Sequence, residues 1–303
     1  MMRAWILLTA LLVATAARAE PIRVFVGVPP LQTFVEGVGG RHVEVHSLVQ
    51  PGQSPHAYEP TPRQVAALTS ADLYVGIGLP FEAGQLPRIR AADPGLRVLD
   101  AREGIDLRRL EVHDHGETRE GGAHEHGHPG DPEAAARAEQ FEMDPHVWTS
   151  PPLGKHIARA IRDALTEIDP ANTAAYEANY NEFSAGLDRL DREIRAELDP
   201  LTRRRFMVYH PAWGYFADTY GLVQIPIEKA GKEPGPRSLA ALVDQARREG
   251  VKVIFVQPQL ASKAAEQVAV AIGGRVVVID PLAADYEASL RRAAREIAEA
   301  ANQ

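Results

Sequence analysis

Three histidines and one aspartate lie beside prolines, at points where extended segments end. The motifs are Pro55-His56-Ala57, Pro145-His146-Val147, Tyr209-His210-Pro211 and Ile279-Asp280-Pro281. Their spacing of 90, 64 and 70 residues forms a pattern that the packing of a core histidine does not require. Because ligands bind at the carboxyl ends of strands in open α/β sheets, these positions predict side chains that meet at a binding site.

The residue types indicate metal binding. The chain of 303 residues contains no cysteine, so a metal site must be built from histidine and carboxylate side chains. Three imidazoles and one carboxylate form a set that suits tetrahedral zinc at distances of about 2.0–2.2 Å. Glu59 or a water molecule could replace Asp280 as the fourth ligand. Copper, nickel and cobalt bind similar donors, so the ligand types alone leave the choice among these metals open.

A second group of histidines lies between Glu111 and Glu142, together with nine acidic residues and two arginines. The only large apolar residues of this tract are Val112 and Phe141, too few to offset the entropy of ordering it, so it is expected to be a disordered surface loop. One interpretation is a solvated acidic loop without a further role. The other is a flexible tract that binds divalent metals weakly, through His113, His115, His124, His126 and His128.

The elements that must position these residues alternate between strands and helices. Strands are predicted over residues 22–28, 42–49, 73–77, 206–209, 223–227, 251–256 and 275–279. Alternation of this kind is typical of parallel sheets with helices on both faces. Between the two halves, apolar residues spaced by three or four from Tyr176 to Leu198 predict one long helix, with Asp169 as its N-cap and Pro170 at its first position.

The first nineteen residues have the pattern of a cleavable signal peptide. Arg3 precedes an uncharged apolar run over residues 5–17, and Ala17-Arg18-Ala19 fits a cleavage site. The run is shorter than the roughly 20 residues that span a bilayer, and no cysteine is present to carry a lipid. We therefore expect an exported, soluble, periplasmic protein. Its net charge of −8 at pH 7 argues against nucleic-acid binding.

Four motifs, in this order, resemble those of the periplasmic zinc-binding proteins of high-affinity ABC importers, the ZnuA/TroA-like family of metal-binding solute-binding proteins. They are Pro55-His56-Ala57-Tyr58-Glu59-Pro60-Thr61-Pro62, Asp144-Pro145-His146-Val147-Trp148, Tyr209-His210-Pro211-Ala212-Trp213-Gly214-Tyr215-Phe216 and Ile279-Asp280-Pro281-Leu282. The signal peptide, the long helix and the histidine-rich tract agree with the resemblance, which spans the mature chain. It implies metal in a cleft between two lobes, held by His56, His146, His210 and Asp280.

The expected fold class is α/β, with two lobes that each contain a mostly parallel sheet flanked by helices, joined by one long connecting helix. The expected division is a signal peptide over residues 1–19, an N-terminal lobe over 20–168 that includes the loop 111–142, a connecting helix over 169–200 and a C-terminal lobe over 201–303.

The function expected from these residues and from the resemblance is capture of zinc in the periplasm and its delivery to an ABC permease with its ATPase. The chain is then a monomeric binding protein without an organic cofactor and not an enzyme. A manganese or other divalent-metal binder of the same family is an alternative, although manganese sites of this superfamily look richer in carboxylates. A mononuclear zinc hydrolase with Glu59 as general base is another alternative, and a zinc buffer or surface adhesin is a third.

Overall fold

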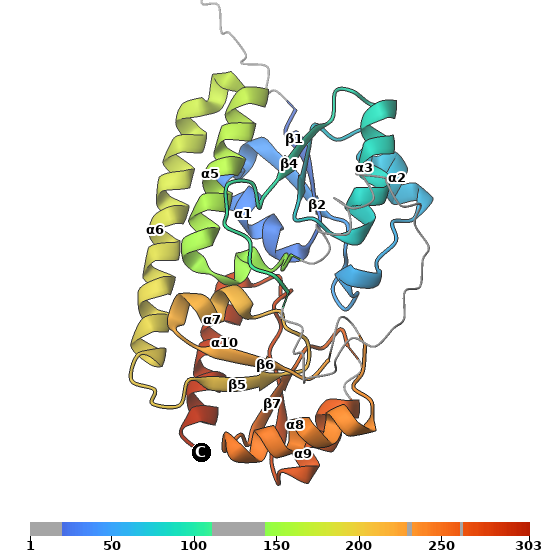
Figure 1. Ribbon diagram of the computed structural model, residues 1–303. Helices are drawn as coiled ribbons and strands as arrows, with labels where there is room; N and C mark the ends of the chain where they lie inside the picture. The colour runs from blue at the N-terminus through green and yellow to red at the C-terminus, as the bar shows by residue number, and fades with distance from the viewer. Residues whose placement is uncertain (1–19, 111–142, 229–231, 261–262) are drawn as a thin grey trace, which may run out of the picture.

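The computed structural model describes residues 20–110, 143–228, 232–260 and 263–303. The predicted signal peptide and the histidine-rich tract lie outside these residues. Within them the chain forms two lobes, one above the other in Figure 1, each built on a parallel four-stranded sheet. The two-lobed α/β architecture predicted from the sequence is confirmed.

The two sheets repeat one topology. The first has the order β2-β1-β3-β4 and the second the order β6-β5-β7-β8, with every neighbouring pair parallel. The strands of the first sheet are β1 (Ile22–Val26), β2 (Val43–Ser47), β3 (Leu73–Gly76) and β4 (Arg97–Asp100). Those of the second are β5 (Arg205–Val208), β6 (Val223–Pro226), β7 (Val253–Val256) and β8 (Arg275–Val278). In each lobe the chain leaves β1 or β5 at the centre of the sheet, where the strand order reverses and ligands of such folds bind.

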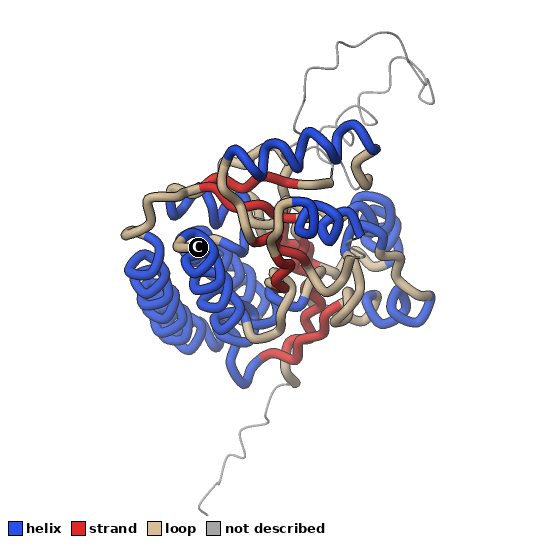
Figure 2. The backbone as a smooth tube through the Cα atoms, turned by 90° about the horizontal axis from the view of Figure 1, so that it is seen from below, coloured by secondary structure: helices blue, strands red, loops and turns tan. Residues whose placement is uncertain are grey.

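Helices cover both faces of the sheets, as Figure 2 shows from below. In the first lobe they are α1 (Pro29–Gly39), α2 (Pro62–Leu68), α3 (Pro80–Ala92) and α5 (Pro151–Ile168). The long α6 (Thr173–Leu198) follows, and the second lobe has α7 (Gly214–Tyr220), α8 (Pro236–Arg248), α9 (Lys263–Ala271) and α10 (Tyr286–Ala301). Short 3-10 turns are formed by η1 (Gly40–His42), η2 (Pro55–Ala57), η3 (Val147–Thr149) and η4 (Pro170–Asn172).

Local sequence signals explain where several helices begin. Pro29 opens α1, since proline costs no hydrogen bond in a first turn. Thr61 and Gln64 form a capping box at the start of α2. The Asp285 side chain accepts a hydrogen bond from the backbone N–H of Ala288 and caps α10. Thr61 and Asp285 follow the segments that carry His56 and Asp280, so each of these segments ends at a fixed helix start.

The long helix α6 joins the lobes. It has 26 residues, about 39 Å at ~1.5 Å per residue, and packs against α1 and α5 of the first lobe and α10 of the second. The predicted start is confirmed for the helical segment as a whole: Asp169 precedes Pro170, which begins the 3-10 turn η4, and this turn leads directly into α6. The Asp169 side chain makes no capping hydrogen bond, and Asn172 is the residue that precedes α6 itself. The Asp169 carboxylate instead accepts hydrogen bonds from Asn172 Nδ2 and from the hydroxyl of Tyr176.

The core runs through both lobes. Phe206 and Val208 of β5 face a large buried cluster that also contains Phe34, Trp148 and residues of α6 and α10. Met207, which points to the other face of β5, belongs to a separate cluster under α8 and α9. Since one continuous apolar cluster joins the two lobes, moving one lobe against the other would disturb buried packing.

The predicted strands are confirmed to within about two residues at their ends, and α6 covers the predicted long helix. The strand β4 and the helix α3 that precedes it were not predicted from the sequence. No helix in the described residues is both long and apolar enough to cross a membrane.

Candidate metal site

Three of the predicted ligands come together between the lobes. His56 lies in η2, beyond β2, while His146 immediately precedes η3 and His210 follows β5 by two residues. One ring nitrogen from each histidine lies within 4.8 Å of the other two, and Nε2 of His56 is 3.1 Å from Nε2 of His210. Two nitrogens bound to one tetrahedral zinc at ~2.0–2.1 Å lie about 3.3 Å apart. The spacing of these rings therefore suits a single ion.

The histidines border a small cavity of about 20 Å³. A cavity needs about 10–15 Å³ to hold one water molecule, so this one has room for an ion but not for an organic solute. Its lining consists of Ser54, Pro55, His56, His146, His210, Gln257, Gln259, Leu260, Pro281 and Leu282. Both lobes thus contribute to the walls.

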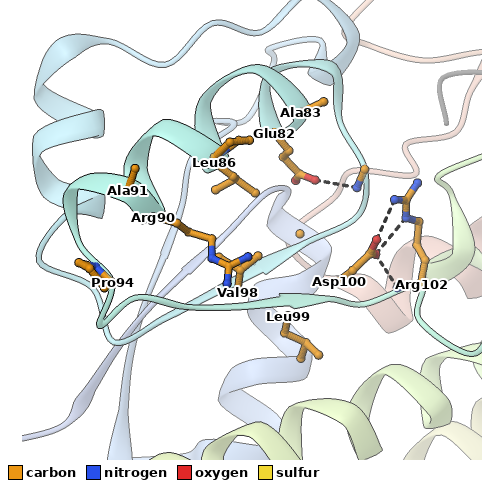
Figure 3. Close-up of a pocket in the computed structure, with 13 residues that line it drawn as sticks. Glu82, Ala83, Leu86, Arg90, Ala91, Pro94, Val98, Leu99, Asp100 and Arg102 are labelled. Carbon is orange, nitrogen blue, oxygen red and sulfur yellow. Dashed lines mark hydrogen bonds and ion pairs between the residues drawn. The ribbon is translucent and has the colours of Figure 1, made fainter. Parts of the chain in front are cut away.

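A much larger cavity, about 620 Å³, lies between α3 and β4 and shares no lining residue with the histidine site. Figure 3 shows Leu86 and Val98 along its apolar side. Its buried acidic group, Glu82, already accepts hydrogen bonds from the Tyr74 hydroxyl at 2.7 Å and from the Gly78 N–H at 2.6 Å. Arg102 is likewise paired with Asp100 at 2.8 Å. These polar groups tie the loop before α3 to the sheet and form no metal-sized cluster.

Two of the three histidines are held from behind by buried carboxylates. Nδ1 of His146 lies 2.7 Å from Oδ1 of Asp144, which is 1% exposed. Nδ1 of His210 is in short contact with Oε1 of Glu228, which is 6% exposed. A carboxylate accepts a hydrogen bond, so the proton of each ring belongs on Nδ1 and the lone pair on Nε2 is free for a metal.

The surroundings of His146 and His56 favour the uncharged form of these two rings, which is the form that binds metal. Desolvation lowers the pKa of His146, and repulsion from His210 adds to this effect, while Asp144 opposes it. The pKa of His56 is well below its ordinary value, first through desolvation and then through repulsion from His210 and His146. His56 as a whole is an exposed residue, but its ring borders the cavity. Neutral imidazoles are ready to coordinate an ion without first losing a proton.

The two candidates for the fourth ligand differ. Asp280 follows β8 by two residues, and its neighbours Pro281 and Leu282 line the cavity, but Asp280 itself is not part of the three-histidine group. Its Oδ1 atom accepts hydrogen bonds from Gln259 Nε2 at 2.7 Å and from the Leu282 N–H at 2.9 Å. Glu59 is exposed and belongs neither to the group nor to the lining.

Hydrogen bonds across the lobes hold the walls of the site. Trp148 Nε1 donates to the carbonyl oxygen of Pro281 at 2.8 Å, and the Tyr286 hydroxyl donates to the carbonyl oxygen of Trp148 at 2.9 Å. The Tyr215 hydroxyl donates to the carbonyl oxygen of Asp144 at 3.0 Å. The segments that carry His146 and Asp280 are therefore fixed to each other.

Sequence reasoning missed Asp144, Glu228 and Gln259 as supporting residues. Asp144 stands two residues before His146 in a motif that was singled out, so its position offered a signal. Glu228 is 18 residues from His210, and Gln259 is 21 residues from Asp280. Neither of these distances has a meaning that can be read without the fold. The five histidines between residues 113 and 128 lie outside the described residues.

Two parallel α/β lobes, a long helix that joins them and imidazoles from both lobes around an ion-sized cavity define a solute-binding protein. Comparison with known sequences places it more narrowly: residues 24–300 match the family described as "Zinc-uptake complex component A periplasmic", ZnuA. The chain belongs to this family.

Comparison with individual proteins of known sequence or structure agrees with this family assignment. The chain is 32% identical over 269 residues to the high-affinity zinc uptake system protein ZnuA of Bacillus subtilis (strain 168), covering 88% of this chain and 80% of that protein. A solved structure described as "Crystal structure of ZnuA" is similar with a TM-score of 0.81 and 38% identity, over 93% of this chain and 100% of that one. A second solved structure, of a ZnuA deletion mutant with zinc bound, is similar with a TM-score of 0.79 and 40% identity, over 93% of this chain and 98% of that one.

Proposed function

We propose that this chain is the periplasmic component of a zinc-uptake system, which captures Zn²⁺ between its lobes and delivers it to an ABC permease. The observation that carries the proposal is the convergence of His56, His146 and His210 from both lobes on one ion-sized cavity. Membership of the zinc-uptake family supports zinc as the cargo. Three imidazoles also favour zinc over manganese, which prefers oxygen ligands.

The proposed ligands are His56, His146, His210 and Asp280, with the histidine-rich tract as a separate set of weak sites. The proposed division of the chain is a signal peptide over 1–19, lobes over 20–168 and 201–303, and the connecting helix over 169–200. We propose that the chain acts as a monomer. The cavity is too small for an organic cofactor, which supports the proposal that the site binds only the metal ion.

A binding role fits the site better than hydrolysis does. A catalytic zinc keeps three protein ligands and an open position for water, and a general base must lie within reach of that water. Glu59, the base that a hydrolase would need, is exposed and does not line the cavity. We therefore propose a four-ligand site that holds and releases zinc without chemistry.

The test is metal analysis of the full chain purified without added metal, followed by competition of Zn²⁺ and Mn²⁺ against a chromogenic chelator. We expect one tightly bound zinc that manganese does not displace at comparable concentration. A matched variant, His46→Ala, removes an exposed histidine of β2 that is not part of the group and should bind zinc like the wild type. His210→Ala should lose the tight site. A site that prefers Mn²⁺, or equal zinc affinity in both variants, would contradict the proposal.

Delivery to a permease is tested in cells. A strain that lacks its own zinc-uptake binding protein but keeps the partner permease should grow on chelated medium when it carries this chain, and fail to grow when it carries His210→Ala. Growth restored equally by both would show that delivery does not depend on the three-histidine site.

A further inference from the structure

Gln259 lies in the segment after β7 and lines the same small cavity as the three histidines. Its Nε2 group donates a hydrogen bond of 2.7 Å to Oδ1 of Asp280. This contact joins the loop after β7 to the loop after β8, two neighbouring strands of the second sheet. It therefore acts on the carboxylate that is proposed as the fourth zinc ligand.

The two oxygens of Asp280 are in different situations. Oδ1 accepts from Gln259 Nε2 and from the Leu282 N–H, so both of its lone pairs have donors. Oδ2 receives no hydrogen bond from any residue that the structure describes. Two donors on one oxygen fix the rotation of the carboxylate and leave the other oxygen available to an ion.

The opposite end of the Gln259 amide supports this orientation. Its Oε1 atom is buried and has no hydrogen-bond partner among the described residues. Turning the amide over would place Oε1 against the Asp280 carboxylate, where two acceptors would face each other. In the observed orientation the amide donates to Asp280 and its Oε1 atom stays unpaired. A buried polar atom without a partner is uncommon in proteins, so this orientation requires a reason, and the hydrogen bond to Asp280 supplies it.

His146 and His210 are held in a similar way, each by one hydrogen-bonding partner. Asp144 accepts from the ring of His146 and Glu228 from the ring of His210, in each case at Nδ1. An imidazole needs an acceptor behind it, whereas a carboxylate needs a donor. A neutral amide also suits Asp280 because it donates without cancelling the negative charge that attracts Zn²⁺.

On the basis of the proposed function, we propose that Gln259 is a positioning residue, which holds Asp280 by one oxygen so that the other completes the zinc site and excludes water from the fourth position. Gln259 then acts on zinc only through Asp280. This distinguishes it from a residue that merely fills space at the cavity wall.

The test compares two glutamines of the same cavity. Gln259→Met keeps the length of the side chain and removes the donor, while Gln257→Met removes a buried amide that also lines the cavity and makes no hydrogen bond to Asp280. Chelator competition should show zinc binding weakened by about 10–100-fold in Gln259→Met, the range for residues that orient metal ligands. The loss in Gln257→Met should be clearly smaller. Equal losses, or tighter zinc binding in Gln259→Met, would overturn the inference.

A double-mutant cycle tests the route of the effect. In an Asp280→Ala background, Gln259→Met should cause no further loss, because the residue through which it acts is gone. Full additivity of the two losses would overturn the inference. If Gln259→Met fails to fold, Gln259→Asn replaces it, since a side chain shorter by one methylene cannot keep the same donor position.

Cobalt substitution gives a readout that a structural role would not change. Azide should leave the visible absorption of the Co²⁺-loaded wild type unchanged and alter that of Gln259→Met, because a position released by Asp280 becomes open to an external ligand. Azide binding to both proteins, or to neither, would refute control of the fourth position by Gln259. A wild type without tight zinc would overturn the proposed function together with this inference, whereas tight zinc binding that is unaffected by Gln259→Met overturns this inference alone.

Discussion

Replacing Glu228 by glutamine tests how the second lobe prepares its histidine. Oε1 of Glu228 is in short contact with Nδ1 of His210, and both side chains are buried. The carboxylate can only accept from the ring, so it keeps the proton on Nδ1 and the lone pair of Nε2 free. An amide of the same shape can either accept or donate. In Glu228→Gln the ring is therefore free to carry its proton on Nε2, where it blocks the metal.

The expected loss of affinity follows from two effects. A hydrogen bond to a charged group contributes about 1.5–3 kcal/mol and a neutral one about 0.5–1.5 kcal/mol. The difference of about 1–1.5 kcal/mol corresponds to roughly 5- to 13-fold in the dissociation constant. The lost tautomer preference moves the result toward the ~10–100-fold that is typical for partners of metal-binding histidines. We expect zinc binding by Glu228→Gln to be weaker by about tenfold or more.

The assay is zinc competition against a chromogenic chelator at pH 7.5, with Glu266→Gln as the control. Glu266 is an exposed residue of α9 in the same lobe, so this variant removes the same charge at a distance from the site. Circular dichroism should show that both variants keep the fold, because glutamine preserves the volume of the side chain. Equal zinc affinity in the two variants would refute the reasoning that Glu228 fixes the tautomer of His210.

Three further results are expected. The lowered pKa values of His56 and His146 mean that the unfolded chain, with histidine pKa near ~6.5, binds protons before the folded one does. The metal-free protein should thus hold its full stability above about pH 6.5 and melt at lower temperature as the pH falls below it, with a weaker pH dependence in His56→Ala; a melting temperature independent of pH would contradict this. Deletion of residues 113–128 should leave one tight zinc and abolish weaker binding in isothermal titration; loss of the tight zinc would make a residue of this tract a primary ligand. Trp148→Phe removes the donor to the buried carbonyl oxygen of Pro281 and should lower the free energy of unfolding, measured by urea denaturation, by about 1–3 kcal/mol. An unchanged free energy of unfolding would show that this hydrogen bond does not help to hold the lobes together.

Patterns within short windows were enough to predict most of the fold. Alternating or continuous apolar runs marked seven of the eight strands, because burial on a pleated sheet demands them. β4 and α3 were not predicted because their apolar patterns are weak. β4 contains two charged residues, and α3 contains an internal proline, Pro87. The stripe from Tyr176 to Leu198 predicted α6, but the spacing did not reveal that the segment opens with the 3-10 turn η4 and becomes α-helical only at Thr173.

The sequence by itself determined which residues are candidates for the site, since residues that follow parallel strands lie at the carboxyl ends of the sheets, where ligands bind. Only the tertiary structure decided that His56, His146 and His210 share one cavity, because their meeting depends on how two lobes pack over a common core. The same holds for the partners that prepare them. Glu228 meets His210 and Gln259 meets Asp280 through neighbouring strands of one sheet, and strand order is a property of three-dimensional packing that a linear spacing does not encode.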